Sequence, residues 1–164
     1  MQDARPKERI LRIVLDEGSV LYRTPEIEHE RAVAMADLLE DNRFSPAGVR
    51  QGPYYLHLSI TDNRLHMQLC TLDDEQNPVT EVARFTVPMA PFRSIIRDYF
   101  IVCESYFEAI KHGSVSRVEA IDMGRRGIHN EGSELLASLL EERVSLDFDT
   151  ARRLFTLICV LHIK

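Results

Sequence analysis

A short segment rich in arginine and glycine, residues 124–132, carries the residue types best suited to bind or transfer a charged group. Its side chains of interest are Arg125, Arg126, His129, Asn130 and Glu131. If Asn130 begins a helix, the helix start offers unpaired N–H groups and a partial positive charge, which favour an anion. The two arginines add the capacity for bidentate contacts with a phosphate or carboxylate.

The histidine of this segment suggests a second chemistry. A histidine titrates near neutral pH, so His129 could act as a general acid or base, with Glu131 orienting its ring. The alternative interpretation is structural: Asn130 caps a helix, the glycines turn the chain, and the arginines pair with acids elsewhere. The segment does not match the phosphate loop of the GxxxxGK[ST] type.

A second arginine pair lies near the end of the chain, in residues 147–153. Adjacent arginines cannot share one face of a helix, so one of them could pair with Asp149 while the other reaches outward. If this helix packs beside residues 124–132, four arginines converge on one anion. The predicted ligand-binding set is therefore Arg125, Arg126, Asn130, Glu131, Arg152 and Arg153. The alternative is a helix cap with local salt bridges, which needs no ligand.

Other kinds of site have weaker support. His57, His66 and Cys70 fall on one face of a predicted hairpin and are ligand types that zinc accepts, but no fourth ligand is obvious. We therefore predict no metal and no cofactor. The sequence contains no Gly-x-Ser-x-Gly elbow, no HExxH motif and no Cys–His signature, so the residues name no reaction and leave open whether the protein is an enzyme.

The first half of the chain predicts the strands of an α+β domain. Residues 10–16 alternate between apolar and polar side chains, as do two runs within residues 54–72 that flank the turn pair Asp62-Asn63. In the hairpin that results, residue i lies opposite residue 125 − i, which places the large aliphatic side chains on one face. With a third strand at residues 82–87, these elements predict a small, mainly antiparallel four-stranded sheet.

The helices are predicted mainly in the second half. Capping signals and helical spacing indicate helices at residues 24–42, 92–112, 116–123, 131–142 and 150–163. Residues 44–53 are expected to form a loop, residues 124–127 to interrupt the helical region, and residues 144–148 to form a short strand. The last helix is apolar all round in its second half, which is typical of a domain centre or a subunit interface.

Composition limits the class of protein. The 164 residues are 45% apolar with a net charge of −6, which excludes a disordered chain and argues against general nucleic-acid binding. No apolar run is long enough for a membrane span. The three cysteines, far apart in apolar segments, indicate reduced buried thiols and a cytoplasmic location. We expect a flexible terminus at residues 1–9 and a single domain at residues 10–164.

The excess of negative over positive charge is confined to one half of the chain. Residues 1–82 carry nine basic and 15 acidic side chains, whereas residues 83–164 carry 11 of each. A local anion site is therefore expected in the second half.

Several long blocks resemble a small family of uncharacterised proteobacterial proteins, one of the UPF class. The blocks are residues 121–132, which include GRRGIHNEG, residues 147–162, DFDTARRLFTLICVLH, and shorter runs at 28–33, 52–54 and 98–106. The resemblance covers residues 8–163. It implies a soluble single-domain protein of about this size and brings no activity, cofactor or catalytic residue with it.

Three functions remain open at this level. The first is a binding or interaction module with an arginine-lined anion site, whose partner is a small anionic ligand or a protein. The second is an enzyme of unknown reaction that uses His129 as general acid or base. The third is a homodimeric scaffold that associates through its C-terminal helix.

Overall fold

The computed structural model describes residues 7–17 and 24–162. Most of the terminus that we expect to be flexible, residues 1–6, lies outside the described residues. Arg9, at the end of that stretch, is only 5% exposed, and its guanidinium donates a hydrogen bond of 2.8 Å to the backbone carbonyl of Leu39. The chain is therefore already anchored at Arg9, one residue before the first strand.

The sheet has four strands in the order β1 (Ile10–Leu15), β3 (Tyr54–Thr61), β4 (Arg64–Leu72) and β5 (Pro78–Pro88). Strand β1 runs parallel to β3, and the other two pairs are antiparallel. The prediction of an α+β fold with a mainly antiparallel four-stranded sheet is confirmed. Strand β5 is longer than the predicted residues 82–87, because its start pairs with the end of β4.

The central hairpin has the predicted register. Leu56 pairs with Leu69, Leu58 with Met67 and Ile60 with Leu65, each pair summing to 125. The turn residues Asp62 and Asn63 have φ angles of 53° and 59°, as a two-residue type I′ turn requires. The buried aliphatic face of this hairpin consists of Leu56, Leu58, Leu65, Met67 and Leu69, each with 0% exposure.

A second, two-stranded sheet joins distant parts of the chain. Strand β2 (Phe44–Pro46) pairs antiparallel with β6 (Val144–Leu146), and Ser45 lies directly opposite Ser145. The expectation of a loop over residues 44–53 is therefore wrong at its start. Phe44 is fully buried and Val144 is 4% exposed, so burial of their side chains favours this extended pairing.

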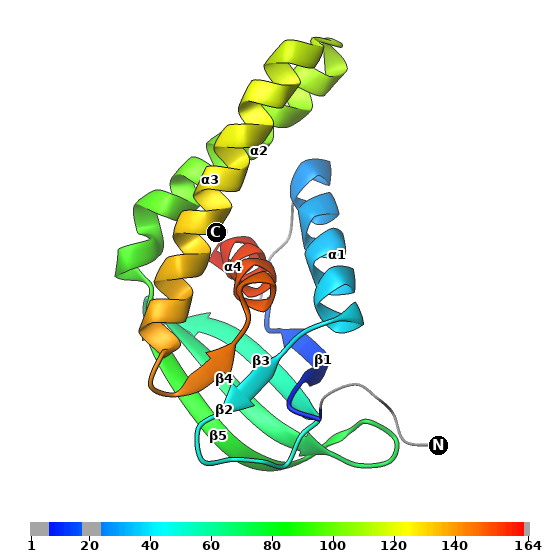
Figure 1. Cartoon of the computed structure of the whole chain (residues 1–164), viewed down its shortest axis with the longest axis vertical. Coiled ribbons are helices and arrows are strands. Elements are labelled where there is room, and N and C mark those ends of the chain that lie inside the picture. The colour runs from blue at the N-terminus through cyan, green and yellow to red at the C-terminus, as the bar shows by residue number, and fades with distance from the viewer. Residues whose placement is uncertain (1–6, 18–23, 163–164) are drawn as a thin grey trace.

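Four helices complete the fold: α1 (Pro25–Glu40), α2 (Arg93–Lys111), α3 (Val115–Leu140) and α4 (Phe148–His162), with a 3₁₀ turn η1 (Ala90–Phe92) before α2. Thr24 caps α1 as predicted, its hydroxyl accepting a hydrogen bond from the Ile27 amide at 3.3 Å. Figure 1 shows α2 and α3 side by side in a long hairpin that projects beyond the sheet.

Helix α4 occupies the centre of the molecule, between α1 and the α2–α3 pair and above the sheet (Figure 1). Its residues 154–160 are all buried, with Thr156 the most exposed at 5%. The side chain of Asp147 caps its start by accepting a hydrogen bond from the Thr150 amide at 3.3 Å. Of the two places we consider for an all-apolar helix surface, the domain centre is the one that α4 occupies.

Helix α3 is continuous, which corrects the prediction of two helices separated at residues 124–127. Gly124 and Gly127 have ordinary helical conformations, and a Cβ added to either would meet no atom within 4 Å. A mid-helix glycine costs up to about 1 kcal/mol relative to alanine, less than the packing of a 26-residue helix can supply. The buried positions that hold α3 in place are His129, Gly132, Ser133, Leu136 and Leu140.

No helix in the described ranges, residues 7–17 and 24–162, combines the length and the apolar character that a membrane crossing requires.

Candidate functional site

Continuity of α3 changes the geometry of the predicted anion site. Asn130 lies in the sixteenth position of this helix rather than at its start, so it offers no free helix N-terminus. Adjacent side chains on a helix diverge by about 100°, and Arg125 and Arg126 accordingly point in different directions. Arg125 is directed into the molecule, whereas the Arg126 side chain is 70% exposed.

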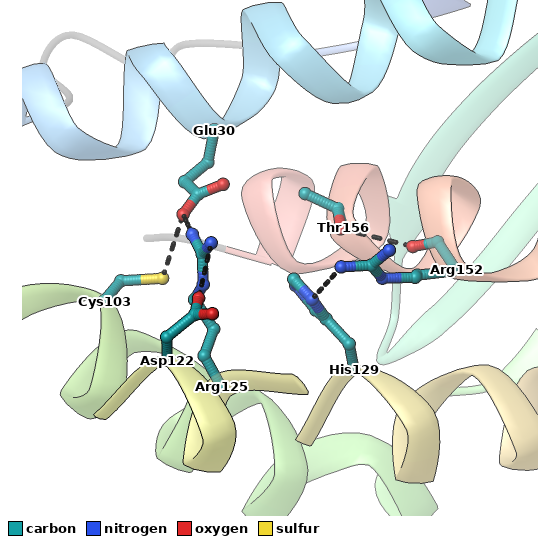
Figure 2. Close-up of polar contacts among 7 residues, drawn as sticks. All are labelled: Glu30, Cys103, Asp122, Arg125, His129, Arg152 and Thr156. Atoms are coloured by element: carbon teal, nitrogen blue, oxygen red, sulfur yellow. Dashed lines mark hydrogen bonds and ion pairs between the residues drawn. The ribbon is translucent and has the colours of Figure 1, made fainter. Parts of the chain in front are cut away.

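Arg125 forms the centre of a largely buried ion-pair network (Figure 2). Its guanidinium donates hydrogen bonds to Glu30 of α1 at 2.7 Å and to Asp122, one turn earlier, at 3.2 Å. The guanidinium also lies over the ring of Tyr106, 4.6 Å from the ring centroid. Two carboxylates thus neutralise Arg125, which leaves no net positive charge for an external anion.

The network includes one thiol. Cys103 of α2 donates a hydrogen bond of 3.6 Å from its Sγ atom to the same Glu30 oxygen (Figure 2). Burial, together with the charge of Glu30, raises the pKa of the Cys103 thiol to about 12. Cys70, Cys103 and Cys159 are all buried and free, as predicted. Cys103 is therefore protonated at neutral pH and is a hydrogen-bond donor rather than a nucleophile.

His129 lies one turn after Arg125 and is 5% exposed. Its Nδ1 atom is 3.5 Å from the guanidinium of Arg152 in α4, an arrangement in which Nδ1 accepts and Nε2 carries the hydrogen (Figure 2). Among the described residues Nε2 has no hydrogen-bond partner. Burial, followed by the charges of Arg152 and Arg125, lowers the pKa of His129 to about 4.

The imidazole of His129 is packed among aromatic rings. Its centroid is 5.3 Å from that of Tyr99 and 6.3 Å from that of Phe155. A neutral, enclosed ring in this setting is well suited to hold α2, α3 and α4 together. Its role as general acid or base, with Glu131 as orienting group, stays a prediction.

The other predicted ligand-binding residues do not meet in one place. Arg126 pairs with Asp122 at 3.1 Å on the solvent side of α3, and Asn130 and Glu131 are exposed farther along the same helix. Arg153 donates a hydrogen bond of 2.7 Å to the backbone carbonyl of Asp41. The structure therefore brings His129 together with Arg152. It links Arg125 to Arg126 through their shared partner Asp122. Arg153 instead contacts the backbone of Asp41.

A different arginine lines an open cavity of about 410 Å³ beside the two-stranded sheet. Its lining residues are Glu8, Arg43, Ser45, Ser145, Leu146 and Asp147. Within the described part of the chain, the Arg43 side chain has no ion pair or hydrogen bond. The cavity thus combines the unpaired guanidinium of Arg43 with oxygen-bearing side chains around it.

The register of the β2–β6 pair creates this cavity. Ser45 lies opposite Ser145, and continuing the pairing by two residues places Arg43 opposite Asp147 on the same face. The intervening residues Phe44 and Leu146 lie opposite each other on the other face, where Phe44 is fully buried and Leu146 packs partly against the core. Sequence reasoning missed this site, although alternation of polar and apolar side chains in residues 43–46 and 144–147 was the available signal.

Carboxylates on both sides of the cavity are only partly used by the protein. Glu8 accepts a hydrogen bond from the Tyr54 hydroxyl at 2.7 Å through Oε2, and Asp147 uses Oδ1 to cap α4. Oε1 of Glu8 and Oδ2 of Asp147 have no hydrogen bond to another described residue. No group of three or more His, Cys, Asp or Glu side chains within the described ranges could hold a metal ion.

Comparison with known proteins places the chain in a family. Residues 7–164 match the model of the uncharacterised protein family UPF0262. A UPF0262 protein of Xanthobacter autotrophicus is 51% identical over 163 residues, which cover 99% of this chain and 96% of that protein. Another from Agrobacterium fabrum is 52% identical over 154 residues, covering 94% of each chain.

A third relative, from Paramagnetospirillum magneticum, is 51% identical over 158 residues that cover 96% of this chain and 98% of the relative. The chain therefore belongs to UPF0262, a family of bacterial proteins with no assigned function, as the resemblance of its sequence blocks predicts. No solved structure matches it.

Proposed function

We propose that this protein is a binding module for a small molecule with a carboxylate or phosphate group, which it holds in the polar cavity through Arg43. The observation that carries the proposal is the unpaired guanidinium of Arg43 in a cavity of about 410 Å³. A cavity of this volume is within the range of small-molecule sites. The proposal keeps the arginine-bound anion predicted from sequence and moves it from Arg125 and Arg126 to Arg43.

Hydroxyl groups beside Arg43 complete the support for an anion. Ser45 and Ser145 line the same cavity, and neither hydroxyl has a hydrogen bond to another described residue. A guanidinium with two hydroxyl donors matches the oxygen atoms of a carboxylate or phosphate. Arg125, by contrast, is neutralised by Glu30 and Asp122.

Titration of ¹⁵N-labelled protein with inorganic phosphate and with N-acetyl-L-leucine, followed by NMR, tests this function. We expect amide shifts at Ser45 and Ser145 that saturate, and at least tenfold weaker binding in Arg43→Ala. Arg50→Ala is the matched control, because Arg50 is exposed in the same segment and does not line the cavity. Absence of saturable shifts with both probes, or equal affinity of Arg43→Ala and wild type, would overturn the proposal.

A further inference from the structure

The charges around Arg43 determine more than a preference for an anion. Glu8 and Asp147 line the same cavity, so two carboxylates accompany one guanidinium. An anion alone would gain attraction from Arg43 and lose part of it to repulsion from both acids. A ligand with a cationic group beside its anionic group would instead interact favourably with all three side chains.

The free oxygen atoms indicate where the cation would bind. Tyr54 occupies one oxygen of Glu8, and the start of α4 occupies one oxygen of Asp147, so each carboxylate keeps one oxygen for a donor. An ammonium group has three N–H donors and no acceptor, which fits two carboxylate oxygens and a serine hydroxyl. Leu146, which lies opposite Phe44 and packs partly against the core, is the apolar residue in the lining of the cavity.

We propose that the ligand of the polar cavity is an α-amino acid, whose carboxylate binds Arg43 and whose ammonium binds Glu8 and Asp147. In an α-amino acid the two charges are separated by a single carbon atom, and the side chain remains free to contact Leu146. This inference rests on the proposed function, because it places the anionic group of the ligand on Arg43.

Three related probes separate the two charges. L-Leucine carries both, N-acetyl-L-leucine lacks the ammonium group, and L-leucinamide lacks the carboxylate. By NMR titration we expect L-leucine to bind at least tenfold more tightly than either derivative. If N-acetyl-L-leucine binds as tightly as L-leucine, the α-amino acid assignment is overturned and the anion site stands. If neither L-leucine nor N-acetyl-L-leucine gives saturable shifts, the α-amino acid assignment is overturned, and if inorganic phosphate gives none either, the anion site is overturned as well.

Two charge-removing variants test the ammonium site directly. In Glu8→Gln the amide oxygen still accepts from Tyr54, and in Asp147→Asn the side chain still caps α4, so both variants should fold. Each should weaken L-leucine binding at least fivefold and leave N-acetyl-L-leucine binding unchanged or stronger. Asp74→Asn, an exposed change outside the cavity, is the control. An equal loss for both probes would contradict a role in binding the ammonium group.

Discussion

Arg125 and Glu30, 95 residues apart in the chain, meet at 2.7 Å in the interior, where the Glu30 side chain is 9% exposed and that of Arg125 is 21% exposed. This contact joins α1 to α3, and Cys103 of α2 donates to the same Glu30 oxygen. Three helices are therefore fixed by one carboxylate. Removing one member of a buried ion pair leaves the other charge buried without a partner, which strongly destabilises the folded protein.

The first prediction concerns this ion pair. Glu30→Gln should lower the free energy of unfolding by about 2 kcal/mol, and a double-mutant cycle with Arg125→Gln should give a coupling energy of about 1–2 kcal/mol. Urea denaturation provides the measurement. The exposed pair Arg84–Glu81, with side chains 58% and 41% exposed, is the control and should couple by less than about 0.5 kcal/mol. A coupling energy near zero for Glu30 and Arg125 would contradict the buried network.

The second prediction distinguishes the glycines of α3. Gly124→Ala and Gly127→Ala should each raise the free energy of unfolding by up to about 1 kcal/mol, because a Cβ at either position meets nothing within 4 Å. Gly132→Ala should destabilise the protein, since its Cβ would lie 2.3 Å from the Phe155 ring. Thermal and urea unfolding of the three variants measure these changes in the free energy of unfolding. A helix broken at residues 124–127 would instead lose stability with the first two substitutions.

The third prediction follows from the pKa of His129, which is about 4 in the folded protein against 6.5 for an ordinary histidine. Between pH 4 and pH 6.5 the unfolded chain binds a proton at this histidine that the folded chain does not, so the free energy of unfolding rises with pH. Acidification from pH 6.5 to pH 4 should therefore remove roughly 3 kcal/mol through this group. In His129→Gln this part of the pH dependence should disappear, as measured by urea denaturation across that range.

His57→Gln serves as the control for the pH experiment, because His57 lies in strand β3, away from the α2–α3–α4 contact. This variant should keep the acid-dependent loss of stability. An unchanged pH dependence in His129→Gln would show that the buried imidazole does not account for it.

The fourth prediction concerns thiol reactivity. Burial raises the pKa of all three cysteines, to about 12 for Cys103, so the native protein should hold its thiols protonated and shielded. A colorimetric disulfide reagent should label the folded protein much more slowly than the same protein in denaturant. All three thiols should react after unfolding. Rapid labelling of Cys103 in the native state would contradict its hydrogen bond to Glu30.

The sheet could be predicted from sequence because the residues that determine its turn and its register are close together in the chain. The turn pair Asp62-Asn63 sets the hairpin, and the two-residue period of side chains fixes its register, since a slip by one residue would expose Leu56 and Leu58. The start of α1 is likewise encoded within a few residues, by Thr24 and the proline after it. Such signals need no knowledge of distant contacts.

The continuity of helix α3 was missed because glycine, taken by itself, favours a turn. Position 132 requires glycine because the ring of Phe155 in α4 would lie 2.3 Å from an added Cβ. A continuous signal was nevertheless present: Val118, Ile121, Ile128 and Leu136 keep helical spacing across the glycines. Tertiary packing overrides the low helix propensity of the segment.

The polar cavity depends even more strongly on distant contacts. Arg43 and Asp147 line one cavity only because β2 pairs with β6, about 100 residues later in the chain. Arg43 belongs to no motif and resembles an ordinary surface charge, and Asp147 lies in the segment 147–153, where the sequence indicates a helix cap. The predicted set around Arg125 relied on a helix start that tertiary packing removes.

The central position of α4 has a consequence for how the protein is made. Its apolar side chains fill the space between α1, α3 and the sheet, and a ribosome synthesises them after every strand of that sheet and after α1, α2 and α3. The aliphatic face of the sheet can form earlier but remains uncovered until residues 148–162 emerge. During that interval the nascent chain exposes the surfaces that favour aggregation, so chaperone binding to nascent chains is expected to end when α4 docks.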